Sequence, residues 1–166
     1  SAGFSVLVST AGSGASASST ITTTTRAYAD PVELGVAGDV AINAVATGSA
    51  TTRTYGTASA AGLIAIAAAV TRATSTVTPT VESRIGGYGD ATRVVQAGGD
   101  IVVGSTLAGS ATARAEGGSD AFGLGVAVGD TTATASIRPA VAGEAMVKSS
   151  ISGGTVRSTG GGINVK

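Results

Sequence analysis

Apolar and polar residues alternate with a period of two along much of this 166-residue chain. Further alternation at a period of two appears in residues 4–8, 40–42, 63–67, 101–103 and 126–128, which are mainly apolar. A period of two places successive side chains on opposite faces of an extended backbone. We therefore predict β-strands in these segments.

Threonine and serine dominate a second set of segments, at residues 20–25, 71–78 and 131–137. Because Thr is β-branched, it favours strands, and here it would leave one face of each strand polar. The breaks between the segments are rich in glycine and predict turns. These breaks lie at residues 35–38, 86–89, 98–99, 117–118 and 153–154.

Residues 60–73 form the one segment whose composition, rich in alanine, also suits a helix. The equivalent residues 121–133 of the following repeat contain Gly123, Gly125 and Gly129. Glycine destabilises helix interiors. We therefore predict that both copies are strands.

The sequence matches itself at an offset of 61 residues. Residues 38–42 align with 99–103, and residues 48–51 align with 109–112. After a one-residue gap the match continues at an offset of 60, which joins Val81 to Val141. Such self-similarity is the signature of a repeat architecture. A unit of about 60 residues could hold two or three β-helix coils of about 20 residues each, or one coil and a long hairpin.

We predict an all-β fold, an elongated β-solenoid resembling a parallel β-helix, with a small-residue interior of Val, Ile, Leu and Ala. Residues 1–42 form a partial repeat, and residues 43–103 and 104–166 form full repeats of one continuous solenoid. Repeat arrays end in atypical caps with a polar outer face. Neither end of this chain has such a cap, so we expect it to be a segment of a longer array.

Composition narrows the range of partners. The chain has ten basic and ten acidic residues, which are spread along its length and give a formal net charge of zero. A protein that binds nucleic acid or anionic lipid needs clustered basic residues. The longest apolar run, residues 60–70, is about half as long as a bilayer span. We expect no nucleic-acid partner and no membrane insertion.

Three features follow one another in a fixed order. They are a turn and strand at 97–103, a Ser/Ala/Thr alternation at 110–115, and a Gly/Val strand at 123–129 that leads into Thr and Ala at 132–135. In this combination the chain resembles the repeats of filamentous-haemagglutinin-like giant adhesins of Gram-negative bacteria. The resemblance covers nearly the whole chain, but residues 160–162 lack the acidic turn residue.

The resemblance implies a β-solenoid that a dedicated outer-membrane partner exports to the cell surface, where it serves as a long stalk. It implies no catalytic residues. We therefore expect an extracellular location and, as the leading hypothesis, a stiff repetitive spacer within an adhesin or surface fibre. Its partners would be adjacent repeats or copies of itself end to end, and any host receptor would bind elsewhere in the protein.

We predict no enzymatic activity and no cofactor. The chain has no His and no Cys, which removes the commonest general base and the thiol nucleophile. A carbohydrate-active β-helix enzyme is the remaining enzymatic alternative and would need two converging carboxylates. The nearest acidic pairs are Asp30 with Glu33 and Glu116 with Asp120, and their turn-like contexts predict solvated loop charges.

Calcium is the one metal alternative. β-Roll repeats bind Ca²⁺ through a G-G-x-G-x-D pattern. Residues 86–90 begin this pattern, but Asp90 stands one position early. Asp39 and Asp100 recur at equivalent positions, which is typical of turn-forming aspartates. We predict a turn role for these residues and keep Asp39, Asp90 and Asp100 as calcium candidates.

A binding module is the second functional alternative. A flat, Thr-rich solenoid face, built from residues such as 22–25, 51–54 and 74–76, could bind glycan or ice. Arginines interrupt these stretches, which weakens the ice version. Aromatic side chains for glycan binding are scarce, although three tyrosines could be exposed. They are Tyr28, Tyr55 and Tyr88.

Overall fold

The computed structural model describes residues 2–4, 7–30, 33–86 and 94–166, and most of them lie in β-strands. The strands are β1 Ala2–Phe4, β2 Val8–Ala29, β3 Glu33–Val36, β4 Val40–Ile85, β5 Val94–Ala97, β6 Ile101–Ile137, β7 Val147–Ile151, β8 Thr155–Ser158 and β9 Ile163–Val165. No helix occurs in the described residues. The all-β prediction is confirmed, including residues 60–73, which lie within β4.

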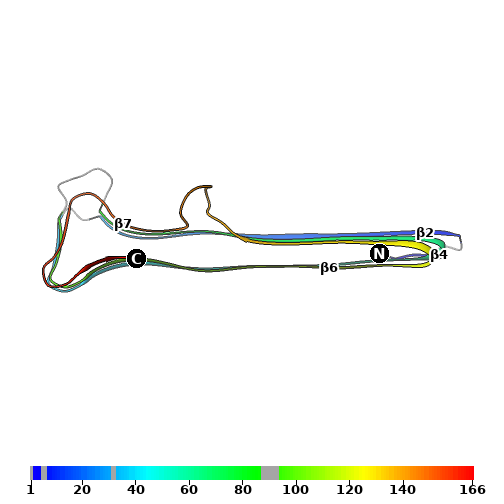
Figure 1. Ribbon diagram of the computed structural model, residues 1–166, viewed down its shortest axis with the longest axis horizontal. Coiled ribbons are helices and arrows are strands. Elements are labelled where there is room, and N and C mark those ends of the chain that lie inside the picture. Colours follow the sequence, from blue (N-terminus) through cyan, green and yellow to red (C-terminus); the bar gives the residue numbers. More distant parts are fainter. Residues whose placement is uncertain (1, 5–6, 31–32, 87–93) are drawn as a thin grey trace. The chain divides into compact units, whose positions relative to one another are not determined.

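The chain divides into two compact units. Unit 1 contains residues 1–20, 49–77 and 110–137, and unit 2 contains residues 21–48, 78–109 and 138–166. The long strands β2, β4 and β6, labelled in Figure 1, contribute residues to both units. The two units are described separately below.

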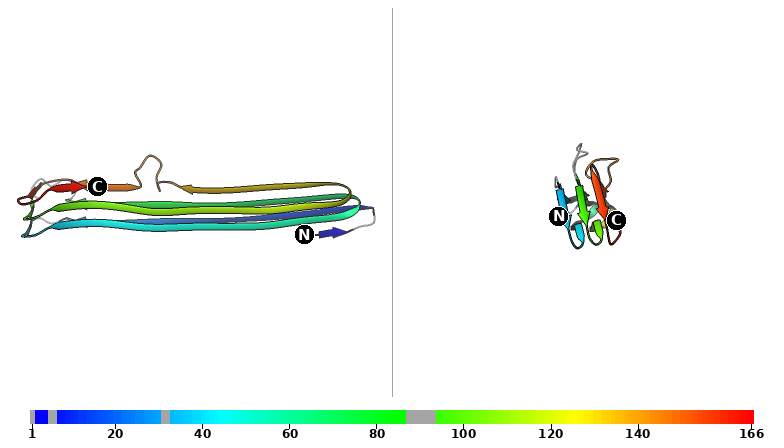
Figure 2. Two further views of the ribbon diagram at one scale, coloured as in Figure 1. Left: turned by 60° about the horizontal axis from the view of Figure 1, so that its bottom comes forward. Right: turned by 90° about the vertical axis from the view of Figure 1, so that its left-hand side faces the viewer.

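Strands pair in parallel with strands about one repeat away. In unit 2, β3, β5 and β8 form a sheet in which Leu34 lies opposite Val95 and Val95 lies opposite Val156, so each step is 61 residues. The right-hand view of Figure 2 shows these short strands side by side. Ile101 of β6 lies opposite Ile163 of β9. Each repeat therefore adds a single layer to the sheet, not two or three.

The register predicted for the end of the last repeat is wrong. The sequence alignment places Val81 opposite Val141, but in unit 2 Val81 lies opposite Val147. Residues 138–146 leave the sheet as a loop between β6 and β7.

Pro79 gives the physical reason for this interruption. The Val81 N–H donates to Met146 O at 2.8 Å, toward β7. Residues two apart on a strand direct their backbone groups to the same side. Residue 79 therefore faces the same neighbour, but proline has no N–H to donate. The ladder is weakest at this point, and the loop leaves the sheet there.

The core of unit 2 is built from apolar side chains of moderate size. Its main cluster contains Val40, Ile85, Val95, Ala97, Ile101 and Val103. A second cluster joins Val81 to Ala44 and Ala46. These residues sit at alternate strand positions, as the period of two predicts.

The core of unit 1 consists of smaller side chains. Its apolar cluster is made of Ala58, Ala60, Ala65, Ala67 and Ala69. Hydroxyl side chains extend the same buried rows, at Thr52, Thr71 and Ser75. Small side chains let neighbouring strands pack with little volume between them.

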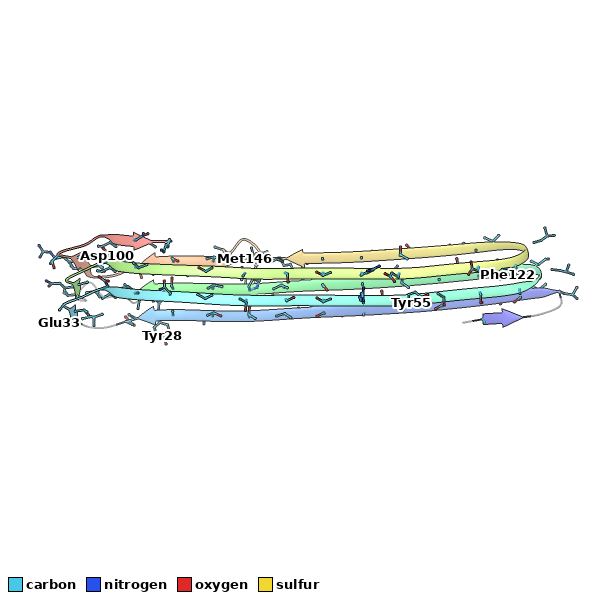
Figure 3. The ribbon with its side chains drawn as sticks, turned by 90° about the horizontal axis from the view of Figure 1, so that it is seen from below. Tyr28, Glu33, Tyr55, Asp100, Phe122 and Met146 are labelled. Atoms are coloured by element: carbon cyan, nitrogen blue, oxygen red, sulfur yellow. The ribbon has the colours of Figure 1, made fainter. Side chains whose placement is uncertain are left out.

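The prediction that leucine fills the interior is wrong for unit 1. Leu63 is 60% exposed and Leu124 is 81% exposed. Both leucines directly follow a glycine, Gly62 or Gly123, and Figure 3 shows the long strands reversing direction near Phe122. Gly123 has a φ of 113°, which only glycine adopts without strain. The interior space beside them is occupied by alanine, so the leucines remain outside.

Candidate functional site

Asp39 and Asp100 occupy equivalent turns of unit 2, each just before a long strand. Asp39 Oδ1 accepts the backbone N–H of Asp100 at 2.8 Å. Asp100 Oδ1 in turn accepts the N–H of Gly162 at 2.8 Å. Figure 3 labels Asp100 at the turn before β6. Each aspartate thus binds the backbone of the next layer, whereas a turn-forming aspartate of the kind predicted from the sequence bonds the backbone of its own turn.

Few side chains that could bind a metal ion lie near these turns. Ca²⁺ takes six to eight oxygen ligands in proteins, several of them usually carboxylates. Within the described part of the chain, no group of three or more His, Cys, Asp or Glu residues could hold a metal ion. Asp90, the third calcium candidate, lies outside the described residues. Of the three calcium candidates, the described part of the chain contains Asp39 and Asp100.

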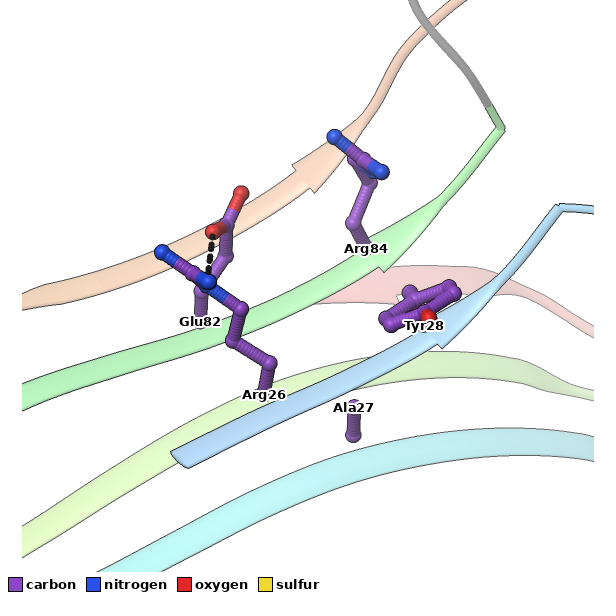
Figure 4. Close-up of a pocket in the computed structure, with 5 residues that line it drawn as sticks. All are labelled: Arg26, Ala27, Tyr28, Glu82 and Arg84. Carbon is purple, nitrogen blue, oxygen red and sulfur yellow. Dashed lines mark ion pairs between the residues drawn. The ribbon is translucent and has the colours of Figure 1, made fainter. Parts of the chain in front are cut away.

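A hollow on the surface of unit 2 collects charged and aromatic side chains. It has a volume of about 350 Å³ and is lined by Arg26, Ala27, Tyr28, Glu82 and Arg84 (Figure 4). The first three residues belong to β2, and the last two belong to the neighbouring strand β4. Because residues two apart share a face, each strand presents two of its polar side chains to the hollow.

Specific contacts order this hollow. Arg26 Nε lies 3.4 Å from Glu82 Oε2, and the Arg84 guanidinium carbon lies 5.9 Å from the centre of the Tyr28 ring. The latter distance is within the range of a cation–π contact. Tyr28 is 65% exposed.

A second hollow, on the surface of unit 1, uses the same residue types. It has a volume of about 370 Å³ and is lined by Arg53, Thr54, Tyr55, Arg114 and Glu116. Arg53 and Tyr55 belong to β4, whereas the Arg114–Glu116 ion pair belongs to β6. Tyr55, labelled in Figure 3, is 71% exposed. Again two arginines, one tyrosine and one glutamate share a small area.

The Thr-rich face is shorter in unit 2 than the sequence suggests. The hydroxyls of Thr22 and Thr78 form a hydrogen bond of 2.7 Å between neighbouring strands. Beside Thr78, however, Arg138, Pro139, Ala140 and Ala142 line a hollow of about 400 Å³, so the loop after β6 lies next to this position. Arg26 follows on the same strand face, two residues beyond Thr24. A flat threonine array of any length is therefore interrupted here.

The two acidic pairs considered for catalysis lie on the surface. Glu116 is held by Arg114 in an ion pair, and Asp120 is exposed. Asp30 and Glu33 are exposed as well. Glu116 lines the unit 1 hollow that contains Tyr55, and the other three residues line neither this hollow nor the unit 2 hollows beside Tyr28 and Thr78.

The sequence analysis missed the pairing that builds the unit 2 hollow. It treated Tyr28 as a possible exposed aromatic and Arg26 as an interruption of the threonine stretch, and it did not consider Glu82 or Arg84. The signal that could have found them is the motif Arg-x-Tyr, which occurs at 26–28 and again at 53–55. In each case the neighbouring strand supplies an Arg and a Glu two residues apart.

Among the described residues, no helix has the length and apolar character needed to cross a bilayer. Comparisons with protein-family models, with curated proteins and with solved structures found no match.

Proposed function

We propose that this chain is a segment of the stalk or fibre of an extracellular bacterial adhesin or surface filament, and that it acts as a stiff repetitive spacer. In this proposal the parallel layers continue as a β-solenoid of about 60 residues per layer. The chain lies outside the cell, catalyses no reaction and binds adjacent repeats or further copies of itself. A receptor, if the protein has one, binds elsewhere.

The observation that carries the proposal is the bonding of equivalent residues in successive layers. In unit 2, Asp39 bonds Asp100 and Asp100 bonds Gly162 at the turns. In unit 1, Ser110 Oγ donates to Ser49 Oγ at 2.9 Å, across 61 residues. A layer that bonds to its neighbour through equivalent groups suits a repetitive rod.

Hydroxyl groups of three serines, of which Ser83 is buried, reinforce the stacking in unit 2. Ser83 Oγ lies 2.8 Å from Ser105 Oγ and donates to Ser149 Oγ at 3.1 Å. Ser105 Oγ donates to Lys148 O at 2.9 Å, and Ser149 Oγ donates to Lys166 O at 2.7 Å. Side-chain bonds of this kind add to the main-chain ladder and resist sliding of one layer over the next.

The test is to lengthen the array. Residues 40–100 can be duplicated without a new junction type, because Asp100 would precede Val40 as Asp39 does now. Neighbouring strands lie about 4.8 Å apart, so ten added copies should lengthen the particle by about 48 Å in electron micrographs. An increase of several hundred ångströms would mean independently folded beads and would overturn the proposal. No increase at all, or aggregation of a misfolded chain by circular dichroism, would also count against it.

A further inference from the structure

Two of the surface hollows, the one beside Tyr28 in unit 2 and the one beside Tyr55 in unit 1, contain the same set of side chains. The hollow of unit 2 combines Arg26 and Tyr28 of β2 with Glu82 and Arg84 of β4, and the hollow of unit 1 combines Arg53 and Tyr55 of β4 with Arg114 and Glu116 of β6. Tyrosine is rare in this chain, with three residues in 166. Both described tyrosines lie in these hollows, and both are mostly exposed.

Fold stability does not account for this arrangement. The two tyrosine rings are mostly exposed and remove little apolar surface from water. The Arg26 side chain is 60% exposed and that of Glu82 is 20% exposed, and an ion pair near the surface typically contributes only about 0.2–1 kcal/mol. The strands would form equally well with threonine at these outward positions, as they do at Thr22 and Thr24. The recurring combination is better explained by a ligand.

The chemistry of the side chains indicates which ligand. Arginine binds carboxylates through two parallel N–H donors. An exposed aromatic ring offers an apolar face with a polar tip, which suits a sugar ring, and a glutamate accepts hydrogen bonds from hydroxyl groups. The volumes of about 350 and 370 Å³ lie at the lower end of the range for ligand sites, roughly 300–1,000 Å³.

We propose that each hollow is a subsite for a carboxylate-bearing sugar unit of an acidic polysaccharide. In unit 2 the sugar carboxylate takes the place of Glu82 at Arg26, the ring lies against Tyr28, and Glu82 accepts a sugar hydroxyl. In unit 1, Arg53, Tyr55 and Glu116 take these roles. The proposal goes beyond the spacer role and does not depend on it, because a non-solenoid protein with these hollows would bind the same ligand.

The test uses the full 166-residue chain and trigalacturonate as the probe, followed by isothermal titration calorimetry. The fully methyl-esterified trimer is the matched neutral probe, because it lacks the carboxylate charges and differs otherwise only by one methyl group on each carboxyl. Binding of the acid with a millimolar dissociation constant is expected, and the ester should bind at least about tenfold more weakly. Equal affinity for acid and ester would overturn the proposal. So would the absence of binding at an acid concentration of about 10 mM.

Variants assign the binding to the hollows. Combined Arg26→Gln and Arg53→Gln should weaken binding of the acid at least about fivefold. Combined Tyr28→Ala and Tyr55→Ala should do so for both probes. The control is Arg72→Gln, because Arg72 lines a hollow of unit 1 with Gly14, Ala15, Ser16 and Val70 but without tyrosine or glutamate. Thermal unfolding confirms that each variant is folded. A loss as large in Arg72→Gln would show non-specific attraction and contradict the assignment.

Discussion

Asp39 accepts the backbone N–H of Asp100 through its Oδ1 atom at 2.8 Å, although 61 residues separate the two in the sequence. The bond joins two turns of unit 2 that carry the same Gly-Asp motif. Asp100 repeats the interaction with Gly162. Gly162, in the third equivalent turn, has no carboxylate and cannot accept a backbone N–H in the same way.

Replacing Asp39 by alanine should lower the stability of the protein. The Asp100 N–H would lose its acceptor, and a bond from a backbone donor to a charged acceptor typically contributes about 1–3 kcal/mol, with the lower end expected at an exposed turn. Urea unfolding followed by circular dichroism measures the change. Asp120→Ala, at an exposed strand position of unit 1, is the control. If both variants lose the same stability, the turn bond has no special role.

Calcium should leave the melting temperature unchanged. Asp39 and Asp100 already bind backbone donors, and a site with so few carboxylates would not complete the ligand shell of Ca²⁺. Thermal unfolding in millimolar CaCl2 and in EDTA compares the two conditions. A clear increase with calcium that disappears in Asp39→Ala would support the calcium alternative instead.

Gly98 and Gly38 should respond differently to alanine. A Cβ at Gly98 would overlap the carbonyl oxygen of Ala37 in the adjacent layer, whereas a Cβ at Gly38 would have nothing within 4 Å. Because backbone has to shift, Gly98→Ala should cost about 1–3 kcal/mol. Gly38→Ala should stay within about 0.5 kcal/mol. Denaturant titration of both variants measures this, and equal losses would refute the close approach of the layers.

Two buried threonines of unit 1 should show opposite effects when changed to valine. Thr71 is fully buried and its Oγ1 has no hydrogen-bond partner, so Thr71→Val should increase stability by about 1 kcal/mol. Thr52 Oγ1 donates to Thr74 O at 3.0 Å and accepts from Ser75 Oγ at 2.8 Å, so Thr52→Val should decrease it by about 1–3 kcal/mol.

Melting temperatures of the two variants provide the comparison. Since the side-chain volume hardly changes in either case, packing differences contribute little. A decrease in both variants would mean that the Thr71 hydroxyl does have a partner in solution, such as a buried water.

The sequence alone predicted many of the strands and much of the register, but the turn predicted at residues 117–118 is wrong, because these residues lie within β6. The repeated Gly-Asp turn at residues 38 and 99 gave the offset of 61 that the pairing of Leu34 with Val95 also has. The loop after Ile137 was missed, because the similarity of Pro79 to Pro139 and Val81 to Val141 suggested a continuous match. The alignment of Pro79 with Pro139 was counted as similarity, although proline has no N–H and interrupts the hydrogen bonds between strands.

The hollow of unit 2 could not be located from the repeat offset. Three residues separate β2 from β3, but eight separate β4 from β5. Because of this difference of five residues, paired positions are 61 residues apart in β3 and β5 but 56 residues apart in β2 and β4. The bond between Thr22 and Thr78 shows the shorter separation. Arg26 therefore meets Glu82, 56 residues later, and not a residue at the repeat distance. Loop lengths vary with little energetic penalty, so sequence comparison gives them no weight.

The stacking of 61-residue layers is tested most directly by a disulfide bond between Ser49→Cys and Ser110→Cys in unit 1. The two Oγ atoms are 2.9 Å apart, and the natural chain has no cysteine. Oxidation should give an intramolecular disulfide in nearly all molecules, detected by mass spectrometry of proteolytic fragments. In the matched pair Ser49→Cys with Thr112→Cys, the second residue is displaced by two positions, and the bond should form far less readily. Equal or preferential bonding to position 112, or bonding only between molecules, would contradict the register on which the layered fold rests.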